Sequence, residues 1–437
     1  MTNTQSFVAG FRNSAPYINA LRSRTLVISF GGEAVIDEKF PNFIHDIALL
    51  NSLGIRLVLV HGARPQIARC LKEKQISSEF VNNLRVTNAA TMNCVKQAVG
   101  NVRVEIEALM SMGLANSPMA GAKIRVISGN FMTARPLGVI NGVDHDHTGE
   151  VRRIDHASIH SHLANGEIVL LSPIGYSPTG EILNVNAEDV ASAVAIELKA
   201  DKLIYLTENQ GIKDNRKKII PALQVSEAES LLNKKRKPTA NKTNYLEKAV
   251  HACRNNVNRV HIIDRHVDGA LIQELFTRDG IGTLISADTY EGLRPATIDD
   301  VGGILELISP LERKDVLVRR SRDHLELEIN HFTVVERDGA IIACSALYPD
   351  AKENIAELAC LVVHPDYQNA GRGNILFEYM EKQAREMGIK KLFVLTTQTA
   401  HWFRERGFKS ADIKSLPIKR KNMYNYKRNS KVYVKIL

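Results

Sequence analysis

The most chemically suggestive part of this sequence is residues 368–373, which directly follow the apolar stretch 361–365. The pattern predicts a strand, a glycine-bearing turn and a helix that begins near Asn374. A helix N-terminus carries unpaired backbone N–H groups and the positive end of the peptide dipole, so it suits a phosphate. Gly371 and Gly373 have no Cβ, so a pyrophosphate could approach the backbone. A glycine turn without a ligand is the alternative, and the amphipathic helix at 375–387 argues against it.

The elements around this turn belong to the last third of the chain. Residues 299–311 read as a helix, and a hairpin is expected where residues 332–336 and 340–347 flank Asp338-Gly339. The strand and helix of the glycine turn follow, then a strand at 391–396 and a closing helix and strand.

The first two thirds of the chain alternate strand-like and helix-like segments. Helices are expected at 40–53 and 187–198, and buried strands at 26–30, 55–60, 167–171 and 202–207. Such alternation predicts an α/β fold with a mostly parallel sheet sandwiched by helices. We divide the chain into an N-terminal helical arm, a larger domain, a linker and a second domain, at residues 1–24, 25–287, 288–292 and 293–437.

Composition excludes several functional classes. The 437 residues are too many for one ordinary core, and no stretch approaches the roughly 18 unbroken apolar residues of a membrane span. The net charge of +9 is spread without aromatic interleaving or a recognition motif, so we expect no nucleic acid partner. The five cysteines lack Cys-x-x-Cys spacing and the first residues lack a secretory signal, which predicts a cytoplasmic protein.

The glycine turn resembles the acetyl-coenzyme A signature of the GNAT acetyltransferases, Gln/Arg-x-x-Gly-x-Gly/Ala after a Val-x-x-Pro strand. Residues 293–437 resemble the GNAT domain of the bacterial N-acetylglutamate synthases, with matching blocks at 317–321, 356–361, 395–397, 401–408 and 426–431. The resemblance implies an α+β domain with a mixed, mostly antiparallel sheet. It implies acetyl-coenzyme A as co-substrate and no other cofactor. The residues expected to bind it are Val362, Val363, Gln368, Asn369, Ala370, Gly371, Arg372 and Gly373.

Acetyl transfer to an amine needs a proton acceptor beside the thioester. Glu357 starts the strand that leads to the glycine turn and could take the ammonium proton through water. An ordinary strand-end carboxylate is the alternative. Backbone N–H groups near residues 360–362 could polarise the thioester carbonyl. Many GNAT members carry a tyrosine where this chain has Phe403, so Thr396, Thr397 or water could protonate the thiolate, or it departs unprotonated.

Glutamate carries two carboxylates, so its pocket needs two cationic anchors. By resemblance these are Arg320 and Arg428, the latter with Ser430, because a guanidinium pairs bidentately with a carboxylate. Arg319 is an alternative to Arg320, since neighbouring residues of a strand face opposite sides. Cys360 falls in the same substrate-binding set, as a packed small residue rather than a nucleophile.

Residues 17–286 resemble the amino acid kinase family, in blocks at 27–32, 59–62, 183–188, 206–208 and 261–285. The departures lie at phosphate-binding positions. Ser29 stands where the kinases have a lysine, and Ala63-Arg64 interrupts the glycine-rich loop. Because phosphoryl transfer depends on positioned positive charge, we predict a kinase-like domain without kinase activity.

Histidines at positions 145, 147, 156, 160 and 162 have spacings that a metal could use. The resemblance implies a surface hairpin and helix in this stretch. We therefore expect surface histidines and no metal site.

Residues 261–264, 271–277 and 280–283 resemble the segment that binds inhibitory L-arginine in arginine-sensitive relatives. By resemblance the effector site consists of Tyr17, His261, Glu274 and Gly280, with the Glu274 carboxylate facing the guanidinium. The alternative is that Glu274 is a solvated helix residue and Tyr17 a packing contact.

Together the resemblances imply transfer of acetyl from acetyl-coenzyme A to the α-amine of L-glutamate, the entry to arginine synthesis, under regulation by L-arginine. They also imply a homo-oligomer, with a hexamer favoured. An acetyltransferase for another amino acid or a protein lysine is one alternative, and a lysine would need one cationic anchor instead of two. A non-catalytic arginine-sensing scaffold is another, against which the glycine turn and Glu357 argue.

Overall fold

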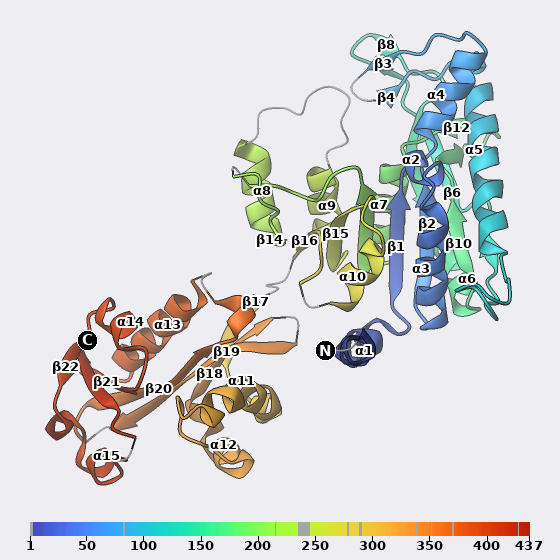
Figure 1. The fold of residues 1–437 in the computed structure, drawn as a ribbon. Coiled ribbons are helices and arrows are strands. Elements are labelled where there is room, and N and C mark those ends of the chain that lie inside the picture. Colours follow the sequence, from blue (N-terminus) through green and yellow to red (C-terminus); the bar gives the residue numbers. More distant parts are fainter. Residues whose placement is uncertain are drawn as a thin grey trace. The chain divides into compact units, whose positions relative to one another are not determined.

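The computed structural model describes residues 3–81, 84–214, 216–234, 245–277, 279–287, 291–337, 339–350, 352–368, 371–426 and 428–437 (Figure 1). The chain forms two compact units, residues 1–288 and 289–437. Most of the linker expected at 288–292 lies outside the described residues, so its limits stay a prediction.

The first unit is built on an eight-stranded sheet. Its strands, in spatial order, are β14 (Ala222–Gln224), β16 (Thr283–Ser286), β15 (Arg259–Asp264), β13 (Lys202–Thr207), β1 (Thr25–Phe30), β2 (Arg56–His61), β10 (Ile168–Leu171) and β5 (Val126–Ile127). Neighbours run parallel except for the antiparallel pair β15 and β16. This confirms the mostly parallel sheet predicted from the sequence.

Helices cover both faces of this sheet because successive side chains of its strands point to opposite faces. On β1, Leu26 and Ile28 pack into one apolar cluster and Val27 into another. The first cluster includes α3 (Phe40–Ser52), α4 (Arg64–Glu73), α5 (Ala89–Met110) and α10 (Ala270–Phe276). The second includes α6 (His156–Ala164), α7 (Ala187–Glu197), α8 (Val225–Lys234) and α9 (Tyr245–Arg254).

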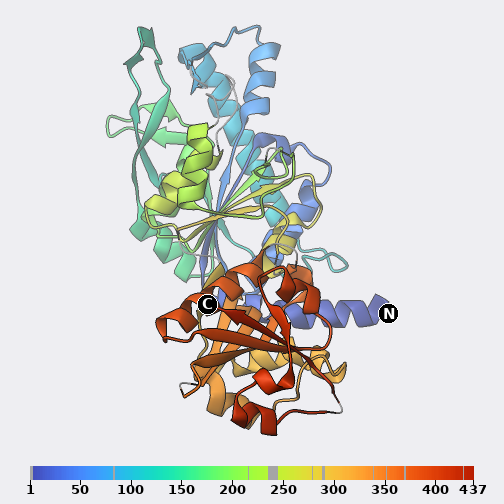
Figure 2. The same ribbon diagram turned by 90° about the vertical axis from the view of Figure 1, so that its left-hand side faces the viewer.

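Helix α1 (Asn3–Leu21) precedes the sheet, as the sequence predicts. In Figure 2 it begins beside the mark N. It packs on the end of α10, where the Ser14 hydroxyl donates to the Phe276 carbonyl over 3.3 Å. Phe7 and Phe11 stack on each other and stay 70% and 62% exposed.

Smaller elements complete the first unit. A four-stranded sheet has the order β12 (Ile182–Asn184), β11 (Ile174–Tyr176), β6 (Met132–Pro136) and β9 (Gly149–Ile154). Short pairs are formed by β3 (Phe80–Val81) with β4 (Leu84–Arg85) and by β7 (Val139–Ile140) with β8 (Val143–Asp144), and α2 (Gly32–Val35) follows β1.

The second unit is a single seven-stranded sheet with helices. The strands, in spatial order, are β17 (Glu291–Pro295), β18 (Phe332–Arg337), β19 (Ala340–Asp350), β20 (Ile355–Val363), β21 (Lys391–Thr396), β23 (Lys431–Ile436) and β22 (Lys409–Ala411). Only β20 and β21 pair in parallel, which confirms the mixed, mostly antiparallel sheet. The helices are α11 (Val301–Arg313), α12 (Arg322–Glu328), α13 (Arg372–Glu386), α14 (Ala400–Arg404) and α15 (Ile418–Asn422).

Candidate active site

The glycine turn of the second unit leads directly into helix α13. A short 3-10 helix, Pro365–Tyr367, separates the turn from β20. The helix begins at Arg372, two residues before the position expected from the sequence, and Gly371 caps it with φ of 81°. That left-handed conformation is strained for residues with a Cβ, which explains the glycine. Asn369 and Ala370 lie outside the described residues.

A cavity of about 460 Å³ opens at the start of α13. Five of the residues expected to bind acetyl-coenzyme A line it: Val363, Gln368, Gly371, Arg372 and Gly373. Val362, by contrast, is buried in the core on the other face of β20, as strand alternation requires.

The opposite wall of the cavity comes from α14 and the residues after it. A Cβ on Gly373 would lie 3.4 Å from Cζ2 of Trp402, so this glycine permits a close approach of the ring. The Arg406 guanidinium stacks on Trp402 at 3.6 Å from the ring centroid, and its Nε donates to Asn374 Oδ1 over 2.8 Å. Our sequence reasoning recognised the block 401–408 but assigned neither residue to the site.

The strands β20 and β21 separate beside this cavity. Their pairing covers only Ile355–Glu357 with Lys391–Phe393. On its other edge β20 has a bulge against β19, where Cys360 adopts φ of 53°. Because later residues of β20 have no paired strand on the β21 side, their backbone N–H groups can face a ligand there.

Glu357 lies where the two strands begin to separate, and only 8% of it is exposed. Its carboxylate forms an ion pair with Arg420 of α15. The Arg420 Nη2 group donates to Oε1 over 2.9 Å, and Nε lies 2.7 Å from Oε2. The second contact has ion-pair distance without hydrogen-bond geometry. Our sequence reasoning did not single out Arg420, which is 63 residues from its partner.

The two arginines expected to anchor a dicarboxylate lie in the same region. Burial and the charges of Arg320 and Arg420 lower the pKa of Arg428, which places Arg428 in the field of the other two guanidiniums. Arg320 donates to the Val318 carbonyl over 3.1 Å, and Arg428 donates to the carbonyls of Asp315 and Val316. Among the described residues, neither Arg320 nor Arg428 has a carboxylate as ion-pair partner.

The segment that carries Arg320 is a loop between α11 and α12, so the strand assumed in weighing Arg319 against Arg320 was wrong. Arg319 is exposed, whereas Arg320 is half-buried beside Tyr348 and Cys360, which raise its pKa against the opposing effect of burial. The geometry therefore favours Arg320. Ser430 is buried, and its carbonyl accepts a hydrogen bond of 2.6 Å from the Tyr424 hydroxyl.

Both halves of the chain match known families. Residues 24–264 match the amino acid kinase family, and residues 302–408 match the acetyltransferase (GNAT) family. The amino-acid acetyltransferase of Azotobacter vinelandii is 52% identical over 433 residues, which cover 99% of this chain and 100% of that protein. Its counterpart in Yersinia enterocolitica is 50% identical over 428 residues, 97% of each chain. The chain belongs to the amino-acid acetyltransferase family.

A solved structure extends the similarity to three dimensions. The N-acetylglutamate synthase of Neisseria gonorrhoeae, complexed with coenzyme A and L-arginine, is 38% identical, with a TM-score of 0.88 and 99% of both chains covered. The same enzyme with coenzyme A and N-acetyl-glutamate gives a TM-score of 0.62. These matches confirm the predicted fold class and the assignment to amino-acid acetyltransferases.

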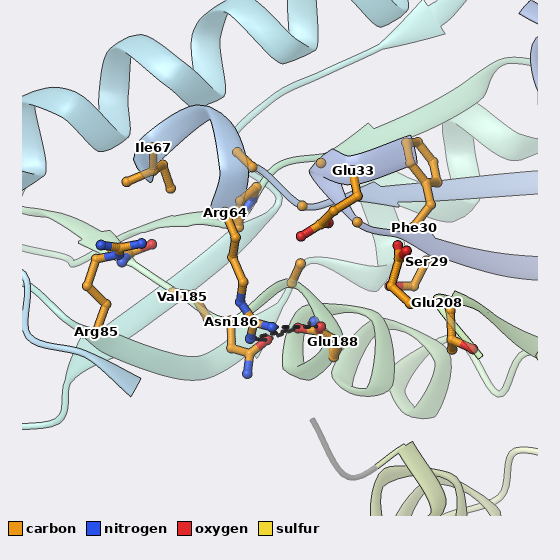
Figure 3. Close-up of a pocket in the computed structure, with 18 of the residues that line it drawn as sticks. Ser29, Phe30, Glu33, Arg64, Ile67, Arg85, Val185, Asn186, Glu188 and Glu208 are labelled. Atoms are coloured by element: carbon orange, nitrogen blue, oxygen red, sulfur yellow. Dashed lines mark hydrogen bonds and ion pairs between the residues drawn. The ribbon is translucent and has the colours of Figure 1, made fainter. Parts of the chain in front are cut away.

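The kinase-like unit of this amino-acid acetyltransferase has its own cavity of about 350 Å³ at the carboxyl ends of β1 and β2 (Figure 3). Arg64, which interrupts the glycine loop, does not project free into it. Its Nη2 group donates to Asn186 Oδ1 over 3.3 Å, and its Nη1 atom lies 3.4 Å from Glu188 Oε1. The Tyr245 hydroxyl donates to the same Oε1 over 3.4 Å. The protein's own carboxylate therefore neutralises this cation.

The predicted effector residues of the acetyltransferase lie close together in the first unit. His261 Nδ1 and Glu274 Oε1 are 2.6 Å apart and both side chains are buried. The backbone N–H groups of Ile281 and Gly282 donate to Oε2 over 2.7 and 2.9 Å. Burial would raise the pKa of Glu274, but His261 and these two donors lower it. Glu274 is therefore not a solvated helix residue.

Gly280 lies against the Glu274 carboxylate, and Tyr17 lies on helix α1. Gly280 has φ of 60°, and a Cβ there would lie 2.4 Å from Glu274 Oε2. Tyr17 packs partly against the core from α1, the helix that contacts α10.

One histidine expected at the surface of the acetyltransferase is buried. His145 is 1% exposed. Its backbone N–H donates to the Gly138 carbonyl and extends the β7–β8 hairpin, and the next residue, Asp146, bridges to Thr87. His156 and His160 are exposed as predicted. Within the described ranges no three His, Cys, Asp or Glu side chains are grouped as a metal site would need, and no helix is long and apolar enough to span a membrane.

Proposed function

We propose that the second unit transfers the acetyl group of acetyl-coenzyme A to the α-amine of L-glutamate. The observation that carries this proposal is the convergence of Arg320 and Arg428, neither of which has a carboxylate as ion-pair partner among the described residues, beside the buried carboxylate of Glu357. A substrate with two carboxylates and one amine matches this arrangement in charge. The gonococcal relative, solved with coenzyme A and N-acetyl-glutamate, supports the assignment.

Acetyl-coenzyme A would bind through the cavity at α13. Its pyrophosphate would meet the backbone N–H groups at the helix start, with Arg372 beside them. The pantetheine arm would then follow Val363 toward the gap between β20 and β21. This places the thioester next to the N–H groups of residues 360–362, which would polarise its carbonyl and stabilise the oxyanion.

Glutamate would bind with its carboxylates on Arg320 and on Arg428 with Ser430, and with its amine toward Glu357. Glu357 accepts a proton from the ammonium group through water, and the neutral amine attacks the thioester carbonyl carbon. When the tetrahedral intermediate collapses, the C–S bond breaks and the amide forms. Phe403 lines the cavity and has no proton to donate, so a hydroxyl such as that of Thr396, or water, protonates the thiolate.

The first unit would serve regulation instead of phosphoryl transfer. Ser29 supplies no positive charge, and Arg64 is paired with Glu188. L-Arginine would bind at His261, Glu274 and Gly280 under Tyr17, by analogy with the gonococcal enzyme solved with L-arginine. We keep residues 1–24, 25–287, 288–292 and 293–437 as the proposed arm, regulatory domain, linker and catalytic domain.

Two further features follow from the same proposal. The exposed Phe7 and Phe11 on α1 support a homo-oligomer, for which we favour a hexamer. The five cysteines are free thiols, four of them buried, which fits a cytoplasmic enzyme.

An acceptor panel tests the proposal. Release of coenzyme A thiol should be rapid with L-glutamate and at least about 100-fold slower with L-glutamine, which lacks one carboxylate. A lysine-containing peptide should give no release above background, and L-arginine should alter the rate with glutamate. Faster release with glutamine or the peptide would contradict the dicarboxylate assignment.

A further inference from the structure

The Glu357 carboxylate, which we propose as the base, already has an ion-pair partner. Arg420 holds Glu357 through both oxygens, at 2.9 Å and 2.7 Å, with 29% and 11% of the two side chains exposed. A guanidinium that stays in place opposes proton transfer to its partner, because a neutral carboxylic acid would leave a part-buried arginine unpaired. With Arg420 in this position, Glu357 is therefore masked.

The surroundings of Arg420 would let an incoming carboxylate compete for it. Arg428 lies in the field of Arg420, and Arg428 has no carboxylate as ion-pair partner among the described residues. One of the two Arg420 contacts lacks hydrogen-bond geometry, so only one directed bond must break for the guanidinium to rotate.

An α-amino acid could both draw Arg420 away from Glu357 and present its own amine to Glu357. Its amine and α-carboxylate are attached to the same carbon. An α-carboxylate bound by Arg428, within the field of Arg420, would therefore attract the Arg420 guanidinium and bring the amine to the neighbouring Glu357. We propose that Arg420 is a positioning residue that masks the base until the acceptor's α-carboxylate draws its guanidinium away. This inference rests on the proposed function, since it takes Glu357 as the base.

The masking would prevent loss of acetyl-coenzyme A to water. An unmasked Glu357 could take a proton from water as the water oxygen attacks the thioester carbonyl. The C–S bond would then break, the thiolate would take up a proton, and acetate and coenzyme A would form. The masking of Glu357 by Arg420 would also make an amine without a neighbouring carboxylate a poor acceptor.

The test compares Arg420→Gln with Lys419→Gln, an exposed lysine of the same helix. We expect R420Q to release coenzyme A without an acceptor about 10-fold faster than wild type. Its kcat/KM ratio for L-glutamate over 4-aminobutanoate, the analogue without the α-carboxylate, should fall about 100-fold. K419Q should behave as wild type. Loss of glutamate transfer in R420Q with no gain in hydrolysis or in 4-aminobutanoate transfer would overturn the proposal.

Two more variants separate this inference from the proposed function. Glu357→Gln should abolish glutamate transfer, and the double variant E357Q/R420Q should lose the extra hydrolysis. Full activity in E357Q would refute the base and the masking together, whereas inactive E357Q beside unchanged hydrolysis in R420Q would refute only the masking. If R420Q does not fold, Arg420→Lys, which keeps the charge but cannot span both oxygens, should raise acceptor-free release about 3-fold, and an unchanged rate would count against masking.

Discussion

The two units treat their arginines differently. In the first, Arg64 interrupts the glycine-rich loop and pairs with Glu188 across the cavity. In the second, Arg320 and Arg428, the proposed glutamate anchors, have no carboxylate as ion-pair partner among the described residues. A cavity can bind an anionic ligand tightly only where the protein's own carboxylates do not already pair with its cations. This difference explains how one chain combines a kinase-like fold with acetyl transfer.

The largest expected effect comes from removing the base proposed for the second unit. Glu357→Gln keeps the shape of the side chain but cannot accept a proton, so kcat should fall by about 10²- to 10⁴-fold. Steady-state thiol release measures this. Glu386→Gln, on an exposed side chain of α13, is the matched control and should retain wild-type rates. A kcat within a few-fold of wild type in E357Q would remove Glu357 from the mechanism.

One pH effect on stability should arise in the first unit, from His61 at the end of β2. Burial lowers the pKa of His61 to about 4, so this imidazole stays neutral in the folded protein while the unfolded chain takes up a proton near pH 6.5. The contribution of His61 to the free energy of unfolding is therefore fully present above pH 6.5 and falls by about 3 kcal/mol as the pH drops to about 4. Asp46 of α3 acts in the opposite direction, because burial raises its pKa to about 6. Urea unfolding followed by circular dichroism should therefore show the His61 loss as a difference between wild type and a His61 variant.

Two measurements distinguish the pH dependence of the first unit from that of the second. Trp402, the single tryptophan, reports the second unit, so its fluorescence transition should not follow the His61 titration. His61→Gln should remove about 3 kcal/mol of the pH dependence, whereas His160→Gln, an exposed control, should not. An unchanged pH dependence in H61Q would contradict the assignment.

Removing a proposed glutamate anchor of the second unit should affect the KM of one substrate. Arg428→Ala should raise KM for L-glutamate about 10- to 100-fold, the value of a charge-assisted hydrogen-bond pair, and change KM for acetyl-coenzyme A less than about 3-fold. Initial rates over a matrix of both substrates measure the two constants, with the exposed Arg319→Ala as control. Equal increases in both constants would argue against a glutamate anchor.

The smallest effect should come from the cap of α13. Gly371→Ala forces a Cβ into φ of 81°, at a strain of about 1–2 kcal/mol. KM for acetyl-coenzyme A should rise about 3- to 10-fold with KM for glutamate unchanged. Gly302→Ala, at an exposed position of α11 with open space around it, should instead stabilise the unit by a few tenths of a kcal/mol. A G371A enzyme with unaltered acetyl-coenzyme A kinetics would mean that this turn is not the phosphate site.

The elements with strong local patterns could be predicted from the sequence. The apolar runs of β13 and β21 have the predicted bounds, because a strand buried on both faces needs a continuous apolar run. The short strands β6, β9, β11 and β12 were not predicted, since three to six residues give little periodicity. The start of α13 was misplaced by two residues because the helix begins at its glycine cap.

Side-chain partnerships were harder to predict than elements. The ion pair of Glu357 with Arg420 joins residues 63 positions apart. The buried His145 lies next to Asp146, which bridges to Thr87 in a distant part of the sequence. Neither has a local sequence signal. The pairing of Arg64 with Glu188 was equally hard to predict, although Arg64 itself was recognised as an interruption of the glycine-rich loop.

One assay tests the division of labour between the two units most directly. Purified full-length protein is incubated with acetyl-coenzyme A, L-glutamate and MgATP, and thiol and ADP are followed in the same sample. As N-acetylglutamate accumulates, a working kinase would phosphorylate it. We expect thiol release that depends on glutamate, with ADP no higher than in the protein-free blank. ADP formation that rises together with thiol release would contradict the loss of kinase activity. Thiol release at the same rate without glutamate would contradict the acetyl transfer to glutamate.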